Sequence, residues 1–366
     1  MNNYYMQFSN CIAIKGYSRT AIYDLQRTRY ILVDNHFAGL LSKYENKIPI
    51  NKIKGKWKHY IDKLIEDEWG FLTTKSLTNL FPPLSLEWKH YAEITNAQID
   101  LCNNDEDINR FFSSLLPQLE ALSCKTFQIN FLNHIHYEHL FSFLERFSDT
   151  QVHLLVIFLP YNLIISNEAN NLYKMQPRLN YLCFYSCPPN LDGTIKNGKS
   201  FYSDMDINVR NNNIISMKYF TANITFFSES QHFNTYYNRK LCISADGEIK
   251  NTPEQLCVYG NIRNMLLSEV LKNKEFKSLW TIHKEMIDVC KECEYRHMCV
   301  DACNLIKRKD NTWYRSKECN YNPYICKWSH EEGYKTLSEC GVKVNEHEFQ
   351  IENAKLNEIC KELWDE

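Results

Sequence analysis

The stretch Cys290-Lys-Glu-Cys293-Glu-Tyr-Arg-His-Met-Cys299-Val-Asp-Ala-Cys303 decides the fold of the carboxyl-terminal third of this chain. It places four cysteines within fourteen residues, and Cys319 follows sixteen residues later. A packed core does not need cysteines at such short, fixed intervals. Thiolates with this spacing surround a metal centre, because a Cys-x-x-Cys pair turns both sulfur atoms toward one ion or cluster. The spacing therefore predicts a metal centre in this region.

Composition and charge limit the classes of protein to consider. The chain has 366 residues, enough for two or three domains, and 44% of them are hydrophobic, enough for a sizeable core. A net charge of −2 favours neither nucleic acid nor an acidic membrane surface as a partner. The first ten residues lack the order of a secretion signal, and the longest apolar run, residues 154–159, is too short to span a bilayer. We therefore expect a cytoplasmic protein, in which fifteen cysteines favour metal binding over disulfides.

Residues 1–82 form the first predicted domain. Its expected strands are residues 11–14, 20–25 and 29–33, and the clearer of two expected helices covers residues 56–68. The order of strands and helices resembles the winged-helix domain with which ribosomal-peptide maturation enzymes recognise a leader peptide. Such a domain holds the leader as an added β-strand. A small structural cap is the alternative interpretation.

Residues 83–229 alternate strands and helices, which predicts an α/β domain with a parallel sheet, either open or a partial barrel. The expected strands are residues 91–101, 127–132, 152–159, 179–185 and 214–227, and the expected helices are residues 107–122 and 137–147. No glycine-rich phosphate loop is present, so a nucleotide-binding fold of the usual kind is not supported. The tail, residues 331–366, contains a predicted helix over residues 346–364.

The cysteine stretch resembles the SPASM domain, an iron–sulfur domain at the carboxyl end of many radical SAM peptide maturases. The resemblance covers residues 236–319, about a quarter of the chain, within a predicted domain of residues 230–330. It implies that one [4Fe-4S] cluster is held by Cys290, Cys293, Cys299 and Cys319. Four thiolates satisfy all four irons of such a cube, so no iron stays open to a substrate.

For the family's second cluster, this chain keeps only part of the ligand set. Cys242 and Cys303 match two of its ligands, whereas Tyr236 and Thr252 stand where the family has cysteines. Cys257 follows Thr252 by five residues and is the candidate replacement. We therefore expect one intact cluster, and a second that is lost or rebuilt.

The middle domain departs further from the radical SAM pattern. That family needs Cys-x3-Cys-x2-Cys after its first barrel strand, and this chain offers only Cys102 there. The nearest imitation, Cys183-x3-Cys187, lacks the third thiolate, and we expect both cysteines to lie in the core. S-adenosylmethionine is therefore not an expected cofactor, nor is standard radical SAM activity expected.

A looser resemblance, carried by Lys15-Gly-x-Ser-Arg19, Tyr23-Asp-Leu-Gln-Arg27, Asn251 and Asn322-Pro-Tyr, extends over most of the chain. It is to the SPASM-domain peptide maturases of grasp-with-spasm systems, which lack the same cysteines. This resemblance implies a degenerate radical-SAM-like partial (β/α) barrel, a precursor peptide whose leader is recognised, and an ATP-grasp ligase as partner. It names no catalytic residue.

Two other functions remain open at this stage. The chain could be a redox or radical peptide-modifying enzyme with a non-standard cluster. It could instead be a zinc-stabilised peptide-binding scaffold, because all-cysteine zinc sites also use Cys-x-x-Cys pairs. The irregular spacing after Cys293 suits the iron–sulfur family better.

Overall fold

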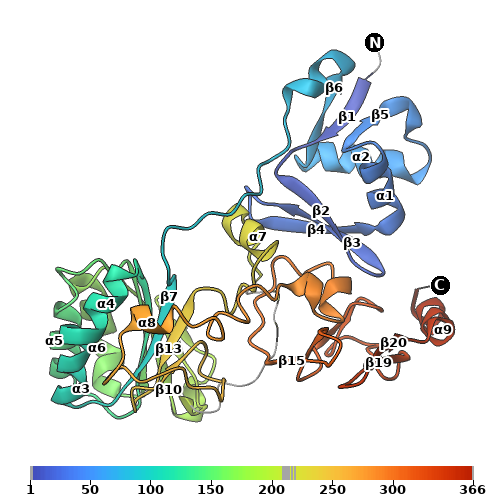
Figure 1. Cartoon of the computed structure of the whole chain (residues 1–366). Helices are drawn as coiled ribbons and strands as arrows, with labels where there is room; N and C mark the ends of the chain where they lie inside the picture. Colours follow the sequence, from blue (N-terminus) through green and yellow to red (C-terminus); the bar gives the residue numbers. More distant parts are fainter. Residues whose placement is uncertain (1–2, 208–214, 216, 218–219, 365–366) are drawn as a thin grey trace. The chain divides into compact units, whose positions relative to one another are not determined.

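The computed structural model describes residues 3–207, 215, 217 and 220–364. The chain forms two compact units (Figure 1). The first unit contains residues 1–88, 213–236 and 282–366, and the second contains residues 89–212 and 237–281. Residues 230–330, which were predicted as one domain, contribute to both units, and the division into four segments remains a prediction.

The first unit begins with two small antiparallel sheets and two helices. One sheet has the order β2 (Cys11–Lys15), β3 (Arg19–Asp24), β4 (Arg29–Asp34), and the other has the order β5 (Lys47–Pro49), β1 (Asn3–Gln7), β6 (Gly70–Thr74). The helices are α1 (Asn35–Lys43) and α2 (Lys56–Glu66). Asp34 caps α1, because its carboxylate accepts a hydrogen bond from the backbone N–H of His36. The three predicted strands and the predicted second helix are confirmed, whereas β1 was missed.

Strand β3 is buried on both faces, and this decides what the amino-terminal sheet packs against. Side chains alternate between the two faces of a strand, so Ile22 and Tyr23 point in opposite directions. Ile22 belongs to a core with Phe37 and Leu41 of α1. Tyr23 belongs to a second core that contains Tyr295, Met298, Tyr321 and Trp328 of the cysteine region. The sheet therefore has helices on one face and the cysteine-bearing segment on the other.

The second unit is built on an eight-stranded sheet, with order β11-β12-β10-β9-β8-β7-β13-β14. Its parallel strands are β7 (Asn96–Leu101), β8 (Thr126–Phe131), β9 (Leu154–Pro160), β10 (Leu179–Tyr185), β12 (Ser200–Tyr202) and β13 (Lys240–Ile243). The antiparallel edge strands are β11 (Ile195–Lys196) and β14 (Ile249–Lys250). The prediction of an α/β fold with a parallel sheet is confirmed.

Helices cover one face of this sheet (Figure 1). They are α3 (Asp105–Arg110), a π-helical turn (Phe111–Leu115), α4 (Leu116–Ala121), α5 (Tyr137–Glu145) and α6 (Leu163–Met175), with the short α8 (Leu267–Val270) also in this unit. Right-handed crossovers between strands added in one direction place successive helices on the same side. Ile99, Ile129 and Ile157 stand in register on neighbouring strands and are fully buried.

Three predicted elements were wrong in type or extent, and one of them, the strand expected over residues 91–101, begins only at Asn96. Within the expected strand 214–227, residues 214, 216, 218 and 219 lie outside the described residues, and α7 (Ile224–Ser230) is a helix. Asn223 starts that helix, because its side chain accepts a hydrogen bond from the N–H of Phe226. In the tail, α9 (Asn353–Trp364) begins later than predicted, because residues of β20 (Phe349–Ile351) pair with β19 (Val342–Val344).

The carboxyl-terminal part of the first unit is otherwise made of short hairpins. These pair β15 (Leu305–Lys307) with β16 (Trp313–Arg315), and β17 (Tyr321–Asn322) with β18 (Lys327–Trp328). Of the helices in the described ranges, none combines the length and apolar character needed to cross a membrane.

Gly16 lies in the β2–β3 turn, against the backbone of the cysteine region. A Cβ atom at Gly16 would lie 2.8 Å from the backbone nitrogen of Glu294. We expect Gly16→Ala to destabilise the protein by about 1–3 kcal/mol, because backbone on both sides would have to shift. The thermal unfolding midpoint of the full chain measures this.

The matched control is Gly39→Ala in α1, where a Cβ would meet no atom within 4 Å. There alanine favours the helix by up to about 1 kcal/mol. Equal midpoints for the two variants would show that the turn does not press against the cysteine region.

Candidate metal centre

The cysteine segment is held in a tight and strained local conformation. Residues Cys290–Glu292 form a single 3-10 turn, and the N–H of Cys293 donates to the carbonyl of Cys290 at 3.0 Å. Val289, just before the turn, has φ 67°, which a β-branched residue rarely adopts. Such strain persists only where the surroundings determine the conformation, and it is concentrated at functional sites.

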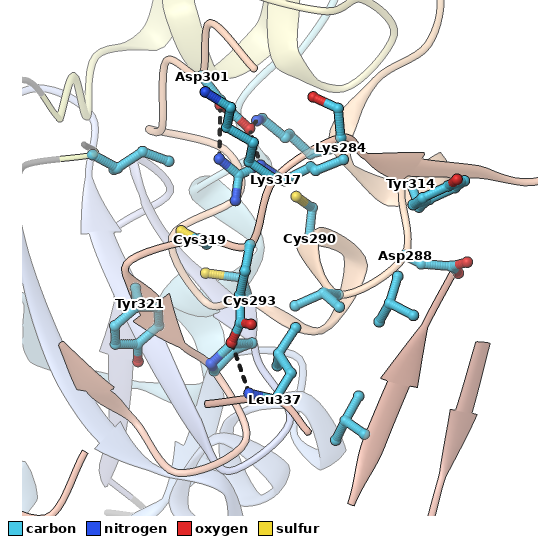
Figure 2. Close-up of a pocket in the computed structure, with 18 of the residues that line it drawn as sticks. Lys284, Asp288, Cys290, Cys293, Asp301, Tyr314, Lys317, Cys319, Tyr321 and Leu337 are labelled. Carbon is cyan, nitrogen blue, oxygen red and sulfur yellow. Dashed lines mark hydrogen bonds and ion pairs between the residues drawn. The ribbon is translucent and has the colours of Figure 1, made fainter. Parts of the chain in front are cut away.

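The four predicted cluster ligands line one cavity of about 410 Å³. They are Cys290, Cys293, Cys299 and Cys319. Figure 2 shows the sulfur atoms of Cys290, Cys293 and Cys319 facing the same space. The structure thus brings the predicted set together, while its role as a ligand set remains a prediction. Over the ranges that the structure describes, no three His, Cys, Asp or Glu side chains are grouped to hold a single metal ion.

Two buried cations lie beside these cysteines, and Asp301 pairs with both. The Asp301 carboxylate is 2.9 Å from Lys284 Nζ and 2.8 Å from Arg315 Nε. Burial alone would raise the pKa of Asp301, but Lys284 and Arg315 hold it well below its usual value. Burial alone would lower the pKa of Lys284, but Asp301 and nearby thiols hold it above its usual value. All three groups are therefore charged near neutral pH, with a net charge of about +1.

The thiols themselves are protonated in this environment. Burial raises the pKa of Cys290 to about 11 and that of Cys299 to about 12. Burial likewise raises the pKa of Cys293 and of Cys319 above the usual value. Cysteine binds metal as the thiolate, so a metal centre here would replace these protons.

The Arg315 guanidinium has buried donors without an acceptor in the part of the chain that the structure describes. Nη1 of Arg315 is buried and finds no hydrogen-bond partner among the described residues. Arg315 interacts electrostatically with the thiols of Cys319 and Cys290. A buried, unpaired donor costs about 1–3 kcal/mol or more, and an anionic group would remove that cost. A thiolate-ligated iron–sulfur cluster is anionic, so the residues present fit it.

The residues predicted for a second centre are divided between the units. Cys242 is buried on β13, and Cys257 is exposed, both in the second unit. Cys303 is buried in the first unit, where its sulfur lies 3.3 Å from Ser316 Oγ. The second centre remains a prediction.

Sequence reasoning missed the charged residues around the cavity. Lys284, Asp301 and Arg315 are separated by 17 and 14 residues along the chain. The only sequence signal was Asp301, an acidic residue inside the cysteine stretch. The residues around Asp301 in the sequence do not indicate which cations its carboxylate pairs with.

Comparison with known proteins gives a distant similarity to solved structures. No protein-family model matches the sequence, and no curated protein matches it. Among solved structures, the chain is similar to the crystal structure of Streptococcus suis SuiB, with 11% sequence identity. The similarity covers 81% of this chain and 94% of that chain, with a TM-score of 0.28.

Asp301 forms ion pairs with both Lys284 and Arg315, so removing its carboxylate from this triad should strongly affect stability. We expect Asp301→Ala to destabilise the first unit by about 3–5 kcal/mol, because it leaves two buried cations without a counter-charge. Thermal unfolding and limited proteolysis of the full chain measure this. The control, Glu332→Ala, removes an exposed carboxylate and should change stability by no more than about 0.5 kcal/mol. Wild-type stability in Asp301→Ala would contradict the role given to the triad.

Proposed function

We propose that this chain is a component of a ribosomal-peptide maturation system, which carries one [4Fe-4S] cluster and binds a precursor peptide. One observation carries the proposal: four cysteines line a single cavity beside two buried cations. The ligands would be Cys290, Cys293, Cys299 and Cys319. A positively charged, largely buried set of groups around four thiols suits an anionic cofactor.

A fully thiolate-ligated cluster exchanges electrons and stabilises the fold around it, but it offers no iron to a substrate. The chain's own residues would exclude water from it and hold its charge, since all four cysteines are at least partly buried. In this proposal the cluster is auxiliary, and a partner ligase of the ATP-grasp class, in the cytoplasm, forms the new bond.

A groove in the amino-terminal region is the proposed peptide site. It has a volume of about 670 Å³ and is lined by β4 residues Tyr30 to Val33 and by residues His59 to Asp67 in and after α2. Strand β4 is an edge strand, so its backbone can pair with an added strand. Leu32 is 38% exposed there, which offers apolar contact to alternate side chains of a bound peptide.

The other edge of the same sheet suits this role less well. In β2, the carbonyl of Lys15 accepts a hydrogen bond from Arg296 at 2.8 Å. The carbonyl of Cys11 accepts one from the Gln7 side chain at 2.6 Å. These contacts already use part of the β2 edge, so β4 is the favoured strand for peptide addition.

Metal content tests the first half of the proposal. Protein purified without oxygen should be brown and contain about four iron and four sulfide per chain. Cys293→Ala should lose this iron and become insoluble or sensitive to protease between residues 240 and 325, because metal binding and folding are coupled.

The control is Cys102→Ser, which changes a cysteine of the second unit that follows β7 and should keep its iron. Zinc without sulfide in the wild-type protein would overturn the cluster assignment and favour a zinc-stabilised scaffold. A soluble, protease-resistant Cys293→Ala protein with full iron would remove Cys293 from the ligand set.

Peptide selection tests the second half. We expect the immobilised full chain to enrich extended peptides from a random display library. Fluorescence anisotropy should show that Leu32→Lys raises the Kd of the selected peptides at least about tenfold, because the variant places a charge on the apolar wall of the groove. Leu163→Lys changes a leucine that is 61% exposed on α6 and should leave the affinity unchanged. Failure to enrich any peptide, or equal affinity in Leu32→Lys, would overturn the groove assignment.

A further inference from the structure

Arg19 lies on β3, far from the cysteine stretch in sequence, yet its side chain contacts that stretch directly. Its Nε lies 2.5 Å from Glu294 Oε1. Its Nη2 donates to the hydroxyl of Tyr295 at 2.9 Å and to the hydroxyl of Tyr321 at 3.0 Å. One guanidinium therefore connects the amino-terminal sheet to three residues of the proposed metal region.

Glu294 is a buried carboxylate that needs this cation. Its side chain is fully buried, whereas that of Arg19 is 25% exposed. Its Oε1 also accepts a hydrogen bond from the hydroxyl of Tyr321. Its Oε2 has no hydrogen-bond partner in the described part of the chain. A buried carboxylate that lost its cation would keep an uncompensated negative charge.

Glu294 is also adjacent to a proposed cluster ligand. It follows Cys293 directly, and the next residue, Tyr295, donates its backbone N–H to Cys293 Sγ at 3.4 Å. The reduction potential of an iron–sulfur cluster depends on the net charge around it and on hydrogen bonds to its sulfur ligands. The residues that Arg19 contacts supply both factors. Glu294 carries the charge, and Tyr295 donates the hydrogen bond to the sulfur atom.

We propose that Arg19 is a positioning residue of the metal centre, which neutralises Glu294 beside Cys293 and so raises the reduction potential of the cluster. The inference rests on the proposed function, because it requires the cluster. The amino-terminal sheet then does more than bind peptide, since one of its own side chains sets a property of the metal centre.

Other contacts hold the same segment in place, so changing Arg19 alters charge more than position. The hydroxyl of Tyr23 donates to the carbonyl of Glu294 at 2.6 Å. The backbone N–H of Tyr17 donates to the carbonyl of Glu292 at 2.7 Å. Arg296 donates to the carbonyl of Lys15 at 2.8 Å. These three bonds remain in a variant that lacks the guanidinium.

The test is a redox titration of the metal-loaded full chain, followed by electron paramagnetic resonance. We expect Arg19→Met to lower the equilibrium constant for one-electron reduction about tenfold, a fall of about 59 mV in midpoint potential. The unpaired Glu294 carboxylate opposes the added electron. Glu294→Gln should shift the potential in the opposite direction, because it leaves the Arg19 charge uncompensated. The double variant Arg19→Met/Glu294→Gln should return to within about twofold of the wild-type constant.

Arg27→Met is the matched control. Arg27 lies in the β3–β4 turn and pairs with Asp24 and Glu68 instead of the cysteine region. The Arg27→Met variant should leave the midpoint potential of the cluster unchanged.

Iron and sulfide are measured in every sample, which separates the two levels of the argument. A wild-type protein without iron overturns the proposed function and this inference with it. Iron-loaded variants with an unchanged potential, or with shifts of the same sign in Arg19→Met and Glu294→Gln, overturn this inference alone. If Arg19→Met does not fold, Glu294→Gln still decides, because a structural role for the pair predicts no rise in potential.

Discussion

The pairing of Asp301 with two buried cations is the interaction on which the cysteine cavity depends. One carboxylate holds Lys284 and Arg315 in place, but it cancels only one of their two charges. Burial of an uncompensated cation is costly, so a further anion close by would stabilise the arrangement. Four thiols line the adjoining cavity, and thiolates bound to a metal would supply that charge. The donor set and its electrostatic surroundings therefore support the same type of cofactor.

The amino-terminal sheet links the two proposed activities of the first unit. Tyr30 of β4 lines the proposed peptide groove, and its ring also contacts the ring of Tyr295 with centroids 5.7 Å apart. Tyr295 in turn donates to Cys293 Sγ. Tyr30 thus connects the groove to the core that contains Tyr295, whereas Ile31, Val33, Tyr60 and Leu64 of the groove pack in the other core of this region.

Local pattern predicted much of this molecule, and long-range pairing explains most of what it did not predict. The strands expected at residues 179–185 and 29–33 followed from local pattern. The set of four cysteines that line one cavity was implied by a family resemblance, which their spacing carries. Strand β1 was missed because its sequence is mixed and its order comes from pairing with β5 and β6. Helix α7 was mistaken for a strand because its apolar run outweighed the cap at Asn223. The contact of Arg19 with Glu294 spans 275 residues, and no local pattern encodes such a pair.

Because β3 is covered on both faces, residues 1–82 and the cysteine region cannot be separated cleanly with a protease or by cloning. An excised amino-terminal fragment would expose Tyr23, Leu25 and Ile14 to water, and the remainder would expose Tyr295, Met298 and Trp328. Aromatic side chains each bury about 150–250 Å², so either piece would carry an apolar patch large enough to promote aggregation. Any genetic rearrangement that moved residues 1–82 to another polypeptide would have to cover that surface in a new way.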